Sequence, residues 1–317
     1  MRVLVTGGAG FIGSTFVDMA LSRALPEISK VIVLDKLTYA GKLSNLGSAS
    51  QHHNFEFFKG DICDPEIVEE LVSKVDAVIN FAAESHVDRS IESSTEFVRT
   101  NVLGAQVLLD ASVKHNIRKF IQVSTDEVYG SIATGSWSEL EPLLPNSPYS
   151  ASKAAADLLV RSYFVTHNLN MNITRCTNNF GPRQDLEKLI PSFISKLNQG
   201  LPVPLYGDGK NIRDWLYVED HCHGIYKVLI KGMPGEIYNI GGGTELTNLN
   251  LAKEILWYMG KSHEMIQYVD DRLGHDRRYS VNFNKILDLG YRPASDFKQS
   301  LQATINWYLN NFQHPEK

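Results

Sequence analysis

The stretch VLVTGGAGFIGS, residues 3–14, runs from a short apolar segment into a glycine-rich turn. Gly7, Gly10 and Gly13 follow the spacing G-x-x-G-x-x-G between an expected first strand and an expected first helix. Glycines at such a turn let backbone N–H groups approach a pyrophosphate, while the helix N-terminus faces its negative charge. The stretch therefore predicts a dinucleotide-binding turn that opens a parallel sheet.

Short β-branched segments alternate with longer helical patterns through the first half of the chain. The expected strands are 3–5, 31–34, 55–58, 77–80, 120–123 and 172–174, and helical periodicity covers 13–24, 65–73, 94–115 and 148–167. This rhythm is typical of an α/β fold of Rossmann type, a doubly wound parallel sheet with helices on both faces. Ligands of such sheets bind beyond the carboxyl ends of the strands.

The rhythm loosens after about residue 178. Strand candidates remain at 203–206 and 236–240, and helical patterns lie near 189–198, 219–231, 248–259 and 296–312. We expect residues 1–178 to form the nucleotide-binding Rossmann domain, with returning segments near 211–240. Residues 179–317 are expected to form mainly a smaller, partly interleaved C-terminal substrate lobe.

The composition is that of an ordinary globular protein, with 317 residues, 43% hydrophobic residues and a formal net charge of −5. This charge gives no electrostatic reason to expect nucleic acid or an anionic membrane as a partner. No apolar run approaches the roughly 18 residues of a membrane span. Because Cys63, Cys176 and Cys222 are far apart and His221 and His223 diverge, we expect free thiols, a cytoplasmic location and no bound metal.

Acidic residues follow the second and third expected strands. Asp35 ends the second strand, where a carboxylate can accept hydrogen bonds from ribose hydroxyls and repel a 2′-phosphate, which favours NAD over NADP. The adjacent Lys36 works slightly against that preference. Asp61 and Ile62 in Gly60-Asp61-Ile62 follow the third strand, either to cover the adenine or to form a plain strand-end turn.

The stretch SPYSASKAA, residues 147–155, begins a helix with Ser147 as the expected N-cap and Pro148 in the first turn. Tyr149 and Lys153 then lie four residues apart on one helix face. A lysine ammonium near a phenol favours the phenolate, and the same lysine can hold a ribose hydroxyl. Together with the glycine turn and Asp35, this pair predicts a hydride-transfer site.

The stretch STDEVYG, residues 124–130, places Asp126 and Glu127 side by side at the end of an expected buried strand. Two close carboxyl groups discourage each other's ionisation, and partial burial favours keeping one of them protonated. The pair can therefore supply an acid and a base, or it can merely cap the following turn.

Several longer segments carry a resemblance to a known family. On these segments the chain resembles the dTDP-glucose 4,6-dehydratases of the extended short-chain dehydrogenase/reductase superfamily, nearly end to end. The segments are DKLTYAG (35–41), FAAESHVDRSI (81–91), STDEVYG, YSASKAA (149–155), TRCTNNFGP (174–182), EKLIP (187–191), GDGKNIRDWLYVEDH (207–221), YNIGGG (238–243) and DRLGHDRRY (271–279).

The resemblance implies NAD as cofactor, dTDP-glucose as substrate and a role for each catalytic residue. Tyr149, held with Lys153, takes the C4 hydroxyl proton as C4 is oxidised. Glu127 is then the base at C5, Asp126 the acid at C6, and Thr125 a hydrogen-bonding group near the C4 oxygen. Oxidation at C4 comes first because it makes the C5 hydrogen α to a carbonyl.

The resemblance also implies two sets of contacts. The cofactor set is Gly7, Gly10, Phe11, Ile12, Gly13, Asp35, Lys36, Leu37, Thr38, Asp61, Ile62, Phe81, Ala82, Ala83, Ser85, Thr100, Tyr149, Lys153 and Asn179. The substrate set is Ser85, Thr125, Asn178, Lys188, Leu189, Pro204, Tyr206, Arg213, Asn248, Arg272 and His275.

The family implies a homodimer in which helices 94–115 and 148–167 of two copies form a four-helix bundle. Phe180 in place of tyrosine is a mild departure from the family pattern. Three positions depart further: Arg183 stands where an aromatic residue is frequent, and Leu186 and Leu273 stand where proline is common. All three fall in loops of the substrate lobe, so they affect loop rigidity or base preference and leave the chemistry unchanged.

Other functions share the fold and the tyrosine–lysine pair. Sugar-nucleotide 4-epimerases typically carry small residues in place of the acids, UDP-glucuronate decarboxylases carry a single glutamate, and GDP-mannose dehydratases lack the aspartate and prefer NADP. UDP-glucose 4,6-dehydration is the closest alternative, because thymine and uracil differ by one methyl group. A non-catalytic NAD sensor or scaffold is a further alternative, although such proteins tend to lose the tyrosine or the lysine.

Overall fold

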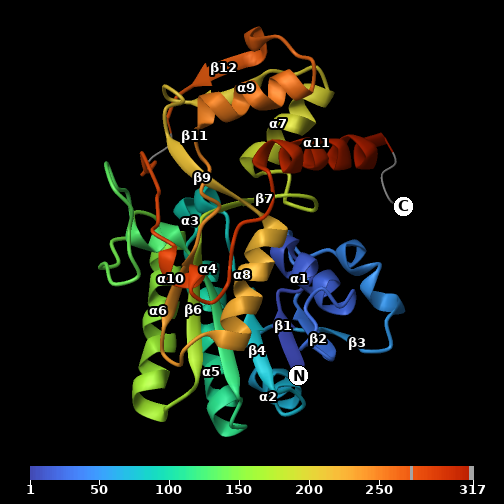
Figure 1. The fold of residues 1–317 in the computed structure, drawn as a ribbon, viewed down its shortest axis with the longest axis vertical. Coiled ribbons are helices and arrows are strands. Elements are labelled where there is room, and N and C mark those ends of the chain that lie inside the picture. The colour runs from blue at the N-terminus through green and yellow to red at the C-terminus, as the bar shows by residue number, and fades with distance from the viewer. Residues whose placement is uncertain (272–273, 314–317) are drawn as a thin grey trace.

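Seven parallel strands form the central sheet of the molecule, in the order β10-β6-β5-β4-β1-β2-β3 (Figure 1). The computed structural model describes residues 1–271 and 274–313. The strands of this sheet are β1 (Arg2–Thr6), β2 (Lys30–Asp35), β3 (Phe55–Lys59), β4 (Ala77–Asn80), β5 (Lys119–Thr125), β6 (Met171–Cys176) and β10 (Ile237–Ile240). The predicted doubly wound α/β fold of Rossmann type is confirmed.

Strand alternation explains why helices cover both faces of this sheet. Val3 and Val5 of β1 belong to one apolar core with helices α1 (Phe11–Leu21) and α8 (Val218–Lys231). Leu4, which points the opposite way, belongs to a second core with α2 (Pro65–Val72), α5 (Gly104–Lys114) and α6 (Pro148–His167). Strands that are apolar on both faces are buried between two helical layers, as in other parallel sheets.

A second lobe lies beyond the carboxyl ends of the strands (Figure 1). It contains the three-stranded sheet β11-β9-β7 and the parallel pair β12-β8, with helices α7, α9 and α11 around a third apolar core. Their bounds are β7 (Asn178–Phe180), β8 (Val203–Tyr206), β9 (Ile212–Tyr217), β11 (Glu245–Thr247), β12 (Ile266–Val269), α7 (Leu189–Asn198), α9 (Asn248–Tyr258) and α11 (Phe297–Gln313).

The chain passes between the two lobes several times. Of the segments in the 211–240 region, β9 pairs with β7 and β11, whereas α8 packs on α1 and β10 pairs with β6 in the large sheet. The remaining short elements are η1 (Leu43–Leu46), η2 (Ala49–Gln51), α3 (Val87–Glu92), α4 (Thr95–Phe97), η3 (Val98–Leu103), η4 (Asp126–Tyr129), η5 (His263–Met265) and α10 (Asn284–Leu287).

The segment predicted as one helix over 94–115 is divided into α4, a π-helical turn at η3, and α5. The wider turn brings Thr100 to the functional cavity and Asn101 to the neighbouring segment. Asn101 Nδ2 donates to the Ser152 hydroxyl (2.8 Å) and to the Glu84 carbonyl (3.0 Å), and its Oδ1 accepts from Glu84 N–H (2.8 Å). Such π-turns are frequent at functional sites.

No helix within residues 1–271 and 274–313 combines the length and the apolar character needed to cross a membrane.

Candidate functional site

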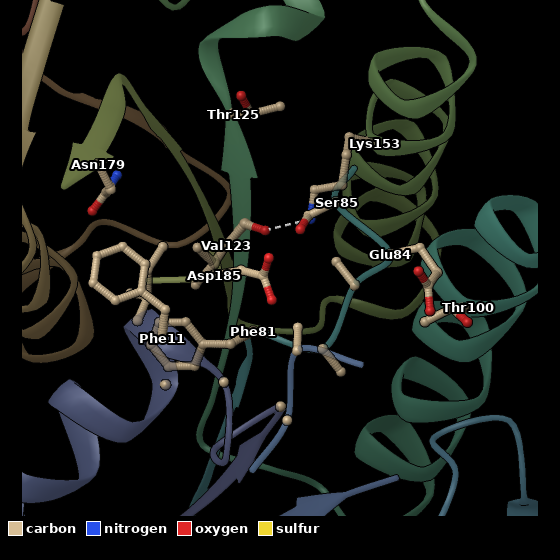
Figure 2. Close-up of a pocket in the computed structure, with 18 of the residues that line it drawn as sticks. Phe11, Phe81, Glu84, Ser85, Thr100, Val123, Thr125, Lys153, Asn179 and Asp185 are labelled. Carbon is tan, nitrogen blue, oxygen red and sulfur yellow. Dashed lines mark hydrogen bonds between the residues drawn. The ribbon is translucent and has the colours of Figure 1, made fainter. Parts of the chain in front are cut away.

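A cavity of about 310 Å³ lies where the large sheet meets the second lobe (Figure 2). Its lining comes from the glycine turn after β1, the ends of β2, β4, β5 and β6, the start of α6, and the loop that follows β7. The carboxyl ends of parallel strands are the usual ligand site of this fold.

The glycine turn is shaped by two close backbone approaches. Gly7 has φ +67°, and a Cβ atom there would lie 2.6 Å from the backbone nitrogen of Ala82. A Cβ atom on Gly13 would collide with the Gly7 carbonyl, so α1 can begin this close to β1 only with glycine there. Gly10 is the N-cap of α1 and has no side chain over the helix end. The turn therefore leaves room for a pyrophosphate at the helix N-terminus.

Asp35 is fixed at the end of β2 by two backbone hydrogen bonds. Its carboxylate accepts from Ala9 N–H (2.9 Å) and Leu37 N–H (2.8 Å). Burial raises the pKa of Asp35, and these two bonds partly oppose that rise. Lys36 forms an ion pair with Asp61 (2.9 Å), so its ammonium is engaged by a carboxylate. This arrangement fits a ribose diol better than a 2′-phosphate.

Helix α6 delivers Tyr149 and Lys153 to the cavity. The Ser147 hydroxyl accepts from Ser150 N–H (3.1 Å) in a capping box, and Pro148 occupies the first turn. Lys153 Nζ donates to the Val123 carbonyl of β5 (2.6 Å; dashed in Figure 2). The helix start and the neighbouring strand thus fix both side chains.

The expected effect of Lys153 on Tyr149 is not what dominates in the structure. Burial, followed by the charge of Glu127, raises the pKa of Tyr149 well above its ordinary value, and a hydrogen bond with Thr125 opposes this. Burial lowers the pKa of Lys153, with Asp157 opposing. Burial therefore outweighs the nearby charges for both groups, and the effect of Lys153 on the Tyr149 phenolate stays a prediction.

The two acids, Asp126 and Glu127, follow strand β5 and begin η4. Thr125 caps η4, and its hydroxyl accepts from Glu127 N–H (3.3 Å). Asp126 is only 3% exposed; burial and the charge of Glu127 raise the pKa of Asp126 well above its ordinary value. Its Oδ1 accepts from the Thr125 hydroxyl (3.3 Å), and its Oδ2 is buried without a hydrogen-bond partner in the part of the chain that the structure describes. Burial therefore favours the protonated form of Asp126, and its Oδ2 lies where it can meet a ligand.

The cavity brings together all five predicted catalytic residues and most of the predicted cofactor residues. Leu37 is the one predicted cofactor residue outside its lining, and it contributes the backbone N–H that binds Asp35. The predicted residues that line it are Gly7, Gly10, Phe11, Ile12, Gly13, Asp35, Lys36, Thr38, Asp61, Ile62, Phe81, Ala82, Ala83, Ser85, Thr100, Thr125, Asp126, Glu127, Tyr149, Lys153, Asn178, Asn179 and Lys188.

The other predicted substrate residues lie in the second lobe, outside this lining. Arg213 on β9 is buried over the Tyr279 ring (4.3 Å) and donates to the Asp276 carbonyl (2.9 Å). Tyr206 at the end of β8 meets His275 edge to face (6.2 Å). Leu189 starts α7, Pro204 lies on β8 and Asn248 starts α9. Arg272 and Leu273 lie outside the described residues.

Sequence reasoning missed several residues of the cavity. Asn179 Oδ1 accepts from Nδ1 of His221, whose burial lowers its pKa to about 3. His221 is thus a neutral ring that orients Asn179, and the signal for it was its place in the family segment 207–221. The loop after β7 contributes Arg183 and Asp185, which the sequence marked only by the departure at Arg183. Lining residues that were not predicted are Leu34, Ala40, Gly41, Gly60, Glu84, Val123, Ser124, Cys176, Thr177, Arg183, Gln184 and Asp185.

Among the residues described, no cluster of three histidine, cysteine or acidic side chains could hold a metal ion.

Comparison with known proteins identifies relatives that match nearly the whole chain. The sequence matches the family described as GDP-mannose 4,6 dehydratase over residues 4–304. A dTDP-glucose 4,6-dehydratase of Actinoplanes sp. is 54% identical over 315 residues, covering 98% of this chain and 98% of that protein.

Two solved structures extend the likeness to the fold. The crystal structure of DesIV, a dTDP-glucose 4,6-dehydratase from Streptomyces venezuelae with NAD and TYD bound, has a TM-score of 0.98 at 50% identity and covers 100% of both chains. A dTDP-glucose 4,6-dehydratase from Bacillus anthracis in complex with NAD has a TM-score of 0.92 at 46% identity, covering 99% of this chain and 98% of that chain. Identity at this level over nearly the whole length shows that the chain belongs to the dTDP-glucose 4,6-dehydratases of the extended short-chain dehydrogenase/reductase superfamily.

Proposed function

We propose that this protein is a dTDP-glucose 4,6-dehydratase, which converts dTDP-glucose to dTDP-4-keto-6-deoxyglucose and water. The observation that carries the proposal is the acid pair: a buried carboxyl group on Asp126 beside Glu127, in the same cavity as Tyr149 and Lys153. A pure redox enzyme or an epimerase needs the tyrosine and the lysine but has no use for two further acid/base groups.

The cavity residues fit NAD. The glycine turn leaves space at a helix N-terminus, and Asp35 ends β2 as a ribose acceptor. Phe81 and Ala82 follow β4, and Thr100 comes from the π-turn. When bound, NAD supplies what side chains lack, a group that accepts the C4 hydride and returns it at C6. Homologous structures contain NAD, which supports the same cofactor here.

Tyr149 is the group proposed to take the C4 hydroxyl proton. Its burial beside Thr125 places the phenol in a site where a neighbouring positive charge has a large effect on ionisation. Lys153, anchored on the Val123 carbonyl, keeps further ammonium hydrogens for a ribose hydroxyl and for the phenol. Thr125 is placed to hydrogen-bond near the C4 oxygen.

Asp126 and Glu127 divide the elimination between them. A ketone at C4 acidifies the C5 hydrogen, which Glu127 removes as a base. Burial and the like charge of Glu127 raise the pKa of Asp126, which favours its protonated form and suits it to protonate the C6 hydroxyl as water leaves. Among the described residues no group forms a hydrogen bond with Oδ2 of Asp126, which supports a donor role at that oxygen.

The substrate diphosphate needs cations in an acidic protein. Lys188 lines the cavity with Asn178 and Ser85, and Arg213 of β9 lies close enough to lower the pKa of Asp126 through its charge. We place the sugar and diphosphate across these residues, with the base toward Tyr206 and Asn248 of the second lobe. This placement rests on family resemblance together with the positions of the two lobes.

The decisive experiment is to incubate the purified protein with dTDP-glucose without added reductant and to follow the product by mass. Loss of one water with a product that carries a 4-keto group supports dehydration. An isomer of unchanged mass, or loss of carbon dioxide from UDP-glucuronate, would exclude it. UDP-glucose in a parallel reaction tests whether the base pocket discriminates thymine from uracil.

The protein is further proposed to act as a cytoplasmic homodimer with a nucleotide-binding domain over 1–178 and a substrate lobe over 179–317. Val98 and Leu103 of η3 and Leu158 and Val165 of α6 are exposed apolar side chains, 54%, 46%, 60% and 62% exposed. Element η3 packs against α5 and α6, which are labelled at the lower left of Figure 1. These exposed side chains support a four-helix bundle between two copies. The three cysteines are free thiols within the described chain, which supports a reducing compartment.

A further inference from the structure

The loop formed by residues 181–188 connects β7 with α7 and borders the cavity. We call this loop the strap. Four of its residues line the cavity: Arg183, Gln184, Asp185 and Lys188. The strap belongs to the second lobe by sequence, yet its charged side chains bind the nucleotide-binding half at two places.

Arg183 forms the first set of contacts between the strap and the other lobe. Its Nη1 donates to Asp18 Oδ2 (2.7 Å) and to the Asn45 carbonyl (2.9 Å), and its Nη2 donates to the Thr15 hydroxyl (3.4 Å). Thr15 and Asp18 lie on α1, the helix that begins at the glycine turn, and Asn45 lies on η1. One guanidinium thus joins the strap to two separate elements of the other lobe, and its side chain is 19% exposed.

The second set of contacts lies at the other end of the strap. Glu187 pairs with Arg89 (2.6 Å) and lies 2.9 Å from Nε2 of His86. Lys188 Nζ donates to the Ser85 carbonyl (2.8 Å). These partners belong to the segment that follows β4, so the strap is held on both sides of the cavity that it borders.

Arg183 is connected to the groups that define the nucleotide site. Asn45, whose carbonyl it binds, donates through Nδ2 to the Ala9 carbonyl (2.8 Å) in the glycine turn. Ala9 in turn donates its N–H to Asp35 (2.9 Å). Hydrogen bonds therefore connect Arg183, through Asn45, to the glycine turn, and this turn borders the pyrophosphate site and binds Asp35.

The backbone of Arg183 is left-handed, with φ +69°, a conformation that costs a side-chain-bearing residue free energy. The contacts of the guanidinium offset this cost. A change to alanine keeps the same backbone demand and removes only the contacts, which makes it a clean test.

We propose that Arg183 is a cofactor-retaining residue that closes the strap over bound NAD and slows its dissociation. The inference rests on the proposed function, since a dehydratase that takes hydride at C4 and returns it at C6 must keep its cofactor throughout each turnover. The strap opens when the hydrogen bonds of Arg183 to Asp18, Asn45 and Thr15 break, and NAD exchanges in that open state.

The test measures the dissociation rate of NADH from the purified protein by displacement with excess NAD, followed by fluorescence. Arg183→Ala and Asp18→Asn are compared with wild type, and Arg2→Ala is the matched control. Arg2 forms an ion pair of similar length with Asp76 (2.9 Å), but inside one lobe. We expect Arg183→Ala to dissociate NADH about tenfold faster or more, Asp18→Asn to show a smaller increase, and Arg2→Ala to match wild type within about twofold.

Two further readouts separate retention from general damage. The double variant Arg183→Ala/Asp18→Asn should dissociate NADH no faster than Arg183→Ala, because Arg183→Ala already removes the contact with Asp18. Diluted Arg183→Ala should lose dehydratase activity that added NAD restores, whereas diluted wild type should keep its activity. Equal NADH dissociation rates in Arg183→Ala and wild type, with both proteins folded by thermal melting, would overturn the proposal. Such a result leaves the dehydratase assay itself untouched, so failure of the retention role and failure of the proposed function are distinguishable.

Discussion

Replacing Asp126 with asparagine separates acid chemistry from shape. Asparagine has the same outline as a neutral aspartic acid, and its Oδ1 can still accept from the Thr125 hydroxyl (3.3 Å in the wild type). Its amide can donate a hydrogen bond where Oδ2 now lies, but it cannot transfer a proton to the departing C6 hydroxyl. General acid catalysis contributes about 10²–10⁴ in rate, so kcat should fall by that factor, or about 3–5 kcal/mol of barrier.

The step that slows identifies the role. C4 oxidation needs Tyr149 rather than Asp126, so single-turnover mixing should show the reduced-nicotinamide absorbance rise at nearly the wild-type rate and then persist. In wild type that signal should stay low or decay rapidly as product forms. A variant in which oxidation slows as much as water loss, with no accumulation of reduced cofactor, would refute the assigned role.

The same substitution predicts a change in stability. A carboxyl whose folded pKa lies above its unfolded value of about 3.9 binds more protons in the folded state. Wild type therefore loses stability as pH rises from about 4 through that folded pKa, whereas the amide does not titrate. Asp126→Asn should gain stability relative to wild type as pH increases, measured by chemical unfolding at several pH values. A pH-independent difference would mean that Asp126 is not held protonated.

Three further predictions follow from the site and the surface. Glu127→Gln removes a charge that raises the pKa of Tyr149, so the acid limb of the C4 oxidation rate should shift to lower pH, while exchange of the C5 hydrogen with solvent should be lost; an unmoved limb would contradict the coupling. Asp35→Asn should weaken NAD binding by about tenfold or more in calorimetric titration, and it should reduce the ratio of NAD affinity to NADP affinity. An unchanged ratio would argue against the ribose contact. Leu158→Glu should convert the proposed dimer to monomer in light scattering, with exposed Lys298→Glu on the other lobe as the control.

The sequence predicted the parts of this molecule that depend on local pattern. The strand–turn–helix at Gly7 and the four-residue spacing of Tyr149 and Lys153 are set within a few residues, so periodicity and backbone geometry are sufficient to predict them. The paired acids were also visible, because both follow one buried strand. Their opposite protonation stays a prediction, and the structure adds that Asp126 is buried and that burial raises its pKa.

The features that sequence could not predict are contacts between distant segments. Periodicity over 94–115 is continuous, so the π-turn that reorients Thr100 is set by tertiary packing such as the bonds of Asn101 to Glu84 and Ser152. The partner of Lys153 is a carbonyl thirty residues away, and Arg183 binds residues more than a hundred positions earlier. Local pattern carries no information on such pairs.

The return of α8 and β10 to the large sheet has a consequence for protein engineering. An exchange of everything after residue 178 with a relative would transplant the second lobe, but it would also replace an edge strand of the large sheet and the helix that packs on α1. Side chains of the relative at those positions would have to pack against the apolar core of this protein, whose shape does not match them. A chimera that changes substrate preference while keeping its fold should therefore be assembled from two inserted blocks, one before α8 and one after β10.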